Sequence, residues 1–158
     1  MNNSINDFLI FLKRKSIEYR FLNMDFEDSN ELSSDNDLLL KKSDFCNINN
    51  LINLFCQESN MRRIQEYRHS FFATNIILIS RDNKKFLNLD FYYDLYYNGI
   101  KFENNELLFI DSVDFRERTN LLPKYDFAQY LIKKINKGGL SKLSFEKILR
   151  LYNLDKTG

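Results

Sequence analysis

Hydrophobic residues recur at helical spacing at both ends of the chain. Near the amino terminus they form one face of a helix that Ser4 can cap: Ile5, Phe8, Leu9, Leu12 and Ile17. The same period predicts a helix over about 47–58. It also predicts one that starts at Pro123 and ends at Gly138-Gly139, and a last helix that opens at Ser141 or Ser144.

Between these helices the pattern changes to short apolar runs separated by turn residues. The runs predict strands over 19–24, 38–40, 61–69, 71–80 and 84–91. Asp82-Asn83 is a turn signal that joins the last two strands into an antiparallel hairpin, and Asn98-Gly99 marks another turn. Residues 25–34 are acidic and polar, which indicates a loop, and 94–118 show no single period.

This order of elements predicts an α+β fold, in which a mixed sheet is flanked by helices and C-terminal helices follow. With 158 residues, the chain is expected to form one domain, or one domain with a short appendage. We therefore divide it into a core over 1–122 and a helical segment over 123–158 that packs on the core.

The charges are balanced, with 23 basic and 22 acidic residues and a net charge of +1. Because non-specific binding of phosphate backbones needs a basic excess, general nucleic-acid binding is not expected. No apolar run approaches the roughly 20 residues of a membrane span, and the amino terminus does not resemble a secretory signal. We therefore expect a cytoplasmic protein. Abundant Asn, Lys, Ile, Phe and Tyr are typical of an AT-rich genome and indicate a bacterial source.

Cysteine and histidine are too scarce to support a disulfide framework or a conventional zinc site. Cys46 and Cys56 are the two cysteines, and His69 is the single histidine. We expect two reduced thiols on or near one helix, and no nucleophilic catalysis built on His69.

The candidate chemistry lies in three aspartates. Asp35 and Asp37 stand two positions apart at the start of an apolar strand, so their side chains are expected on the same face. Two neighbouring carboxylates repel each other unless a cation lies between them. Asp90 lies in another apolar strand, which we expect to be a neighbour of the Asp37 strand. Its side chain either faces a cation or shares a solvated face with Asn88. Such a set could hold divalent ions around a triphosphate, although a solvated turn would also explain Asp35 and Asp37.

The motif Asp35-Asn36-Asp37, followed by a helix, a hairpin and the Asp90 strand, resembles the nucleotidyltransferase superfamily, which has the fold of DNA polymerase beta. It is most similar to bacterial members encoded with capsule and surface-polysaccharide biosynthesis genes. The matching segments are Tyr19-Arg20-Phe21-Leu22-Asn23, Ser34-Asp35-Asn36-Asp37, and Tyr130-Leu131-Ile132-Lys133-Lys134 with Lys137-Gly138.

The resemblance implies Mg²⁺, or Mn²⁺, on Asp35, Asp37 and Asp90, which would also be the catalytic residues. It implies transfer of a nucleoside monophosphate from an NTP to an unknown hydroxyl or phosphate acceptor. The residues that it implies for nucleotide binding are Ser34, Lys133, Lys134 and Lys137. The three lysines would equally suit the solvated end of a helix.

The chain departs from the superfamily pattern at its phosphate-binding loop. No glycine precedes the aspartates where relatives place a Gly-Gly or Gly-Ser pair, and Asn36 replaces an apolar residue. A catalytically degenerate binding or scaffolding module is therefore an alternative. A nuclease that uses the same carboxylates is a weaker one, because no lysine or histidine lies close to either motif in the positions usual for a nuclease.

Two further groups have competing interpretations. Arg62, Arg63 and Arg68 could bind the acceptor, but charges on an edge strand more often prevent edge-to-edge pairing. The aromatic residues of 91–97 could stack on a base or a sugar, although we favour a place in the core and at the rim of the sheet.

Overall fold

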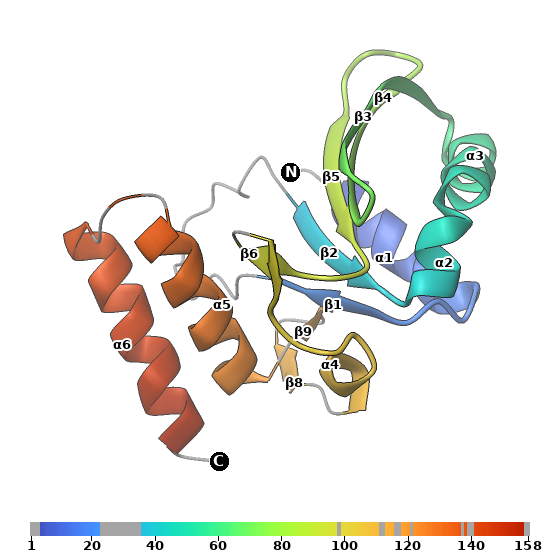
Figure 1. The fold of residues 1–158 in the computed structure, drawn as a ribbon. Helices are drawn as coiled ribbons and strands as arrows, with labels where there is room; N and C mark the ends of the chain where they lie inside the picture. Colours follow the sequence, from blue (N-terminus) through green and yellow to red (C-terminus); the bar gives the residue numbers. More distant parts are fainter. Residues whose placement is uncertain are drawn as a thin grey trace.

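The computed structural model describes residues 4–22, 36–97, 99–110, 113–115, 118–120, 122–136, 138 and 141–156. It confirms an α+β fold with a mixed sheet, helices on both faces and two C-terminal helices (Figure 1). The loop expected over 25–34 lies outside the described residues.

The first half of the chain supplies the centre of the sheet and the helices of one face. Its elements are α1 (Ser4–Arg14), β1 (Tyr19–Phe21), β2 (Asn36–Leu40), α2 (Lys42–Cys46) and α3 (Ile48–Ser59). α1 buries the apolar stripe that the sequence predicts, while its cations Lys13 and Arg14 lie in the last turn, where they suit the helix dipole.

A long antiparallel ribbon follows, made of β3 (Met61–Ser70), β4 (Ala73–Ser80) and β5 (Phe86–Tyr92). β4 begins two residues later than expected because Phe71 and Phe72 form the turn after β3. The turn between β4 and β5 contains Asn83 in the left-handed conformation, with φ of 59°. The hairpin predicted from Asp82-Asn83 is therefore confirmed.

The remaining elements are short strands and helices: β6 (Tyr96–Tyr97), β7 (Ile100–Lys101), α4 (Leu107–Ile110), β8 (Val113–Phe115), β9 (Arg118–Asn120), α5 (Pro123–Asn136) and α6 (Lys142–Lys156). Gly99 has φ of +80°, in keeping with the turn expected before β7. The sequence pattern predicted α5 and α6 but missed α2, β6, β7, α4, β8 and β9.

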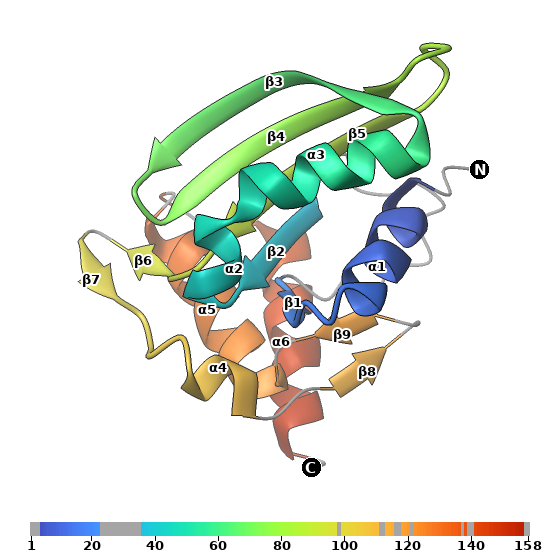
Figure 2. The ribbon, with the colours of Figure 1, turned by 90° about the vertical axis from the view of Figure 1, so that its right-hand side faces the viewer.

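The strands of the main sheet follow the order β3-β4-β5-β2-β1-β9-β8. Most pairs are antiparallel, whereas β2 and β5 are parallel, as are β1 and β9. The Arg-rich β3 is an edge strand, as expected from its charges. β2 and β5 are therefore central neighbours although a helical crossover and two strands separate them in the chain (Figure 2).

Alternation along the central strands divides the buried residues into two clusters. On one face Leu38, Leu40 and Phe91 join the main core, which α1 and α3 cover. On the other face Leu39 joins a smaller cluster with Leu95, Leu108 and Phe109, against which Tyr92, Tyr97 and Tyr125 pack. The helices α5 and α6 lie on the side of this second face (Figure 1). Within the described part of the chain, no helix is long and apolar enough to cross a membrane.

Candidate functional site

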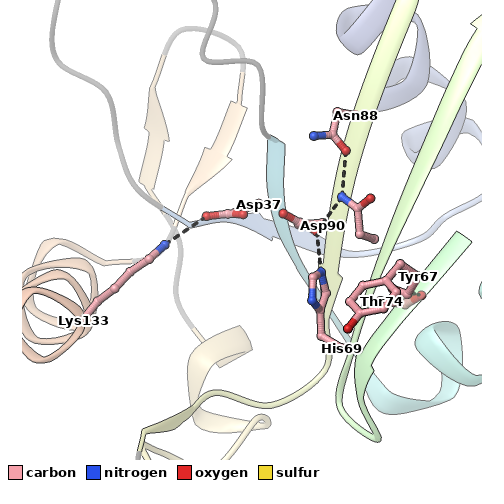
Figure 3. A network of polar contacts seen from close by, with 8 residues as sticks. Asp37, Tyr67, His69, Thr74, Asn88, Asp90 and Lys133 are labelled. Carbon is pink, nitrogen blue, oxygen red and sulfur yellow. Dashed lines mark hydrogen bonds and ion pairs between the residues drawn. The ribbon is translucent and has the colours of Figure 1, made fainter. Parts of the chain in front are cut away.

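Asp37 of β2 and Asp90 of β5 are direct partners in the parallel pair at the centre of the sheet. Because partners in register project to the same side, the two carboxylates lie next to each other on one face (Figure 3). The expectation that Asp37 and Asp90 lie on neighbouring strands is thus confirmed.

The local sequence explains why both aspartates take this face. In β2, Leu38 and Leu40 are buried in the main core. Because successive side chains of a strand project to opposite faces, Asp37 projects away from this core. In β5, Leu89 and Phe91 are buried in the same core, so Asp90 projects away from it as well. The side chains of Asp37 and Asp90 are 13% and 18% exposed, so both charges are largely shielded from water.

Asparagine amides hold the surroundings of Asp90 in place. The Nδ2 atom of Asn75, on β4, donates to Asp90 Oδ1 and to Asn88 Oδ1, each at 2.7 Å. Asn36 Nδ2 donates to the carbonyl oxygen of Asn88 at 2.9 Å, which ties the start of β2 to β5. Asn36, which departs from the family pattern, therefore holds the two strands together.

A cation or titratable group approaches each carboxylate. Lys133, from α5, places its Nζ atom 3.6 Å from Asp37 Oδ2. His69, near the end of β3, places Nε2 3.6 Å from Asp90 Oδ1. Figure 3 shows the two side chains reaching the carboxylates from separate elements. The Lys133 and His69 side chains are 35% and 47% exposed, so both groups that face the carboxylates are accessible to solvent.

Tyr97 forms part of the same side of the sheet. Its hydroxyl hydrogen-bonds to the side chain of Gln129, which is 2% exposed, and its ring packs on the second cluster. Burial raises the pKa of Tyr97 strongly, and the negative charges of Asp37 and Asp126 raise it further, although the bond to Gln129 opposes them. Tyr97 therefore remains a neutral hydroxyl beside Asp37.

The other predicted site residues divide into two groups. Ser34, Asp35 and Lys137 lie outside the described residues. Lys134 is described and lies apart from the carboxylates, with its Nζ atom 5.3 Å from the ring centroid of Tyr130.

The structure also shows where the arginines of β3 and the aromatic residues of 91–97 lie. Phe91 and Tyr93 are buried, and Tyr92 and Tyr97 pack on the second cluster, which confirms the core interpretation of the aromatic run. Arg63 forms an ion pair with Glu66 on the edge strand. Both cysteines are free: Cys46 ends α2 and Cys56 lies in α3.

Oxygen donors dominate the part of the site that is described. Two carboxylates on one face are the hard ligands that Mg²⁺ and Mn²⁺ prefer, so this donor set fits such an ion. Among the described residues, no three His, Cys, Asp or Glu side chains are grouped as a metal site. A full set of three carboxylates therefore depends on Asp35.

Sequence reasoning missed His69, Asn75 and Tyr97. The sequence shows no lysine or histidine in the positions usual for a nuclease, but in space His69 and Lys133 each lie 3.6 Å from one of the carboxylates. Strand pairing brings His69 and Asn75 to the site, and the packing of α5 brings Lys133. The polar residues Asn75 and Asn88 within apolar strands were the available signal.

Comparison with known proteins gives little independent guidance. No protein-family model matches the sequence, and no curated protein matches it significantly. Two crystal structures from Helicobacter pylori are similar, each at 12% identity over 97% of this chain. One is the protein JHP933 (TM-score 0.36, 88% of its chain covered), and the other carries a name that suggests a nucleotidyltransferase (TM-score 0.37, 90% covered). At such TM-scores neither likeness supports an argument about this chain.

Proposed function

We propose that this protein is a Mg²⁺-dependent nucleotidyltransferase, which transfers a nucleoside monophosphate from an NTP to a hydroxyl or phosphate acceptor. The observation that carries the proposal is the pair of shielded carboxylates, Asp37 and Asp90, on one face of two adjacent central strands. The resemblance of the aspartate motif to relatives in surface-polysaccharide biosynthesis supports a role in that process.

Each residue near the pair suits one part of this reaction. Asp37 and Asp90, with Asp35, would hold the divalent ion, which would offset the charge of the triphosphate and of the departing pyrophosphate. Asp90 is also placed to accept the proton of an acceptor hydroxyl, while Asn75 fixes one of its oxygens. Lys133 would attract the phosphate oxygens of a nucleotide that is held at the carboxylates, because its ammonium group lies within reach of this position, beside Asp37.

One observation favours the alternative, a binding or scaffolding module that has lost the reaction. Asp37 already faces Lys133, and Asp90 already faces Asn75 and His69, so protein groups alone partly offset the two carboxylates. The missing glycine pair before the aspartates points the same way, because backbone amides there would otherwise hold phosphate.

Thermal unfolding with nucleotides separates the two functions. We expect ATP, GTP, CTP or UTP to raise the melting temperature by several degrees with Mg²⁺ or Mn²⁺ present, because a ligand at 100 times its Kd stabilises the native state by about 2.7 kcal/mol. Pyrophosphate release in the presence of a sugar-phosphate or polyol acceptor then measures transfer directly. If none of the four NTPs shifts the melting temperature, the scaffold function is the correct one.

A pair of variants on one helix provides a matched control. Lys133→Met should weaken the NTP-dependent shift, because it removes the cation beside Asp37. Lys134→Met removes the same charge one residue away, where the side chain lies over Tyr130, and should weaken the shift less. Equal effects of the two substitutions would contradict the placement of nucleotide beside Asp37.

A further inference from the structure

A second candidate binding site lies between β3–β4 and the helices α2 and α3, in a cavity of about 300 Å³. Arg68 and Thr74 line it from the sheet, and Lys42 and Cys46 line it from α2. This volume is at the lower end of the range for small-molecule sites, about 300–1,000 Å³. The proposed transfer reaction uses none of its residues.

The cavity and the carboxylate pair lie on opposite faces of the sheet. Thr74 pairs with Phe91, whose side chain is in the main core, whereas the next residue, Asn75, pairs with Asp90. Since successive side chains in a strand alternate, Thr74 and Asn75 project to opposite sides. Arg68 pairs with Thr74 and shares its side. A ligand in this cavity is therefore separated from Asp37 and Asp90 by the sheet itself.

The charge that lines the cavity is positive. Glu66 is its one carboxylate, and Glu66 already forms an ion pair with Arg63, at 2.8 Å. Neither Arg68 nor Lys42 has a carboxylate partner among the described residues. Lys42 instead lies over the ring of Tyr93, with Nζ 5.6 Å from the centroid. Two cations beside one cavity favour an anionic ligand.

Three aromatic residues, Phe45, Phe71 and Tyr93, form another part of the wall. Phe45 and Tyr93 contact each other edge to face, with ring centroids 4.9 Å apart, and both are buried. Phe71, at the turn after β3, is 60% exposed although its ring lies against Tyr93 and Tyr96. A large aromatic side chain that lines a cavity and is also exposed offers a surface on which a planar ring can stack.

We propose that this cavity binds a small planar anion, with the ring against the aromatic wall and the negative group on Arg68 and Lys42. Aromatic carboxylates and nucleoside monophosphates share this chemistry. The proposal does not depend on the transfer reaction, because no residue of the cavity belongs to the carboxylate site.

Cys46 provides a direct readout, because it lines the cavity and is exposed. The chain has two cysteines, so a Cys56→Ala variant carries Cys46 as its only thiol. The rate of Cys46 alkylation by iodoacetamide is measured in EDTA with AMP, benzoate, adenosine or inorganic phosphate. We expect AMP or benzoate to slow it by about tenfold at ten times Kd, since only the unbound fraction reacts. Adenosine and phosphate, which each carry half of the required chemistry, should protect much less.

Variants decide whether the protection comes from this cavity. Arg68→Gln, or Lys42→Gln where that protein does not fold, should abolish protection. Arg62→Gln, on the same strand with its guanidinium on Asn83, should retain it, as should Asp37→Asn. Protection by AMP but not benzoate identifies the phosphate source, and the reverse result the carboxylate source. The proposal is overturned if no probe protects Cys46, if adenosine or phosphate protects as well as the ring anions, or if Arg68→Gln and Lys42→Gln leave protection unchanged.

Discussion

At the scale of single residues, the arrangement of Asp37 and Asp90 has an electrostatic cost. Adjacent strands are only about 4.8 Å apart, so two ionised carboxylates in register repel each other. Lys133 offsets part of this repulsion, but its half-exposed side chain limits the gain to the roughly 0–1 kcal/mol of a surface ion pair. The chain thus keeps a charge arrangement that binding of a cation would improve.

Asp37→Asn should therefore separate activity from stability. We expect transfer to fall by about two orders of magnitude or more, because a hard anionic ligand is lost. In EDTA the melting temperature should stay the same or rise, since one of two repelling charges is removed. A clear drop of the melting temperature in EDTA, measured against the wild type, would instead identify Asp37 as a structural residue.

Tyr97 should make stability depend on pH in the alkaline range. The pKa of Tyr97 is about 10 in the unfolded chain and is raised in the folded protein. At pH values between the two, the unfolded state binds fewer protons than the folded state. Stability from Tyr97 is therefore complete below pH 10 and declines above it, by up to about 1.4 kcal/mol per pH unit.

Tyr97→Phe should make this decline shallower and also lower stability at pH 7, because Gln129 loses its partner. Urea unfolding at pH 7, 10 and 11 measures both effects. Tyr67→Phe, at an exposed position, is the control and should change neither. An unchanged alkaline slope in Tyr97→Phe would show that other groups cause the decline.

At the scale of elements, β1 and α4 are joined through the buried Arg20. Its guanidinium donates to the carbonyl oxygens of Tyr19 and Phe109, each at 2.9 Å, and lies 4.8 Å from the ring centroid of Phe109. A lysine has no planar fork with which to reach both carbonyls and stack on the ring. Arg20 therefore holds α4, which is only four residues long, against the sheet.

Arg20→Lys should lower the free energy of unfolding by about 1–3 kcal/mol, because a buried carbonyl loses its donor. Urea denaturation followed by circular dichroism measures this change. Arg62→Lys, at an exposed position of β3, is the matched control and should remain within about 0.5 kcal/mol of the wild type. Similar losses in both variants would argue against a special role for Arg20.

Elements with a clear period were predictable from the sequence, and short elements were not. α1, α3, α5 and the β4–β5 hairpin each contain enough residues to show a period or a defined turn. β8 and β9 have three residues each and α2 has five, so they depend on contacts with the rest of the fold. At the site, Asp37 and Asp90 were evident because charges interrupt apolar strands, whereas His69 and Lys133 were hidden because strand order and helix packing place them.

At the scale of the whole molecule, α5 covers part of the second face of the sheet. Tyr125 packs on the second cluster, and Asp126 and Gln129 are almost completely buried. α6 in turn packs on α5 and buries Leu151. The division of the chain at residue 122 therefore stays a prediction from the sequence. We expect the first 122 residues to need α5 for stability.

Truncation tests this dependence. A fragment of residues 1–122 should melt well below the full chain and bind a hydrophobic dye, because its second cluster loses the cover of α5. A fragment of residues 1–136 keeps α5 and loses only α6, so it should retain more of the stability. Equal melting temperatures for the 1–122 fragment and the full chain would show that the core folds independently.

The parallel pairing of β2 with β5 also sets the order in which the protein can mature during translation. The bond from Asn36 to Asn88 spans 52 residues, so a ribosome must release α2, α3, β3 and β4 before β2 gains this neighbour. Lys133 emerges later still. A nascent chain that ends before β5 therefore carries Asp37 without Asp90, and the pair of carboxylates arises only once β5 has been synthesised and has paired with β2.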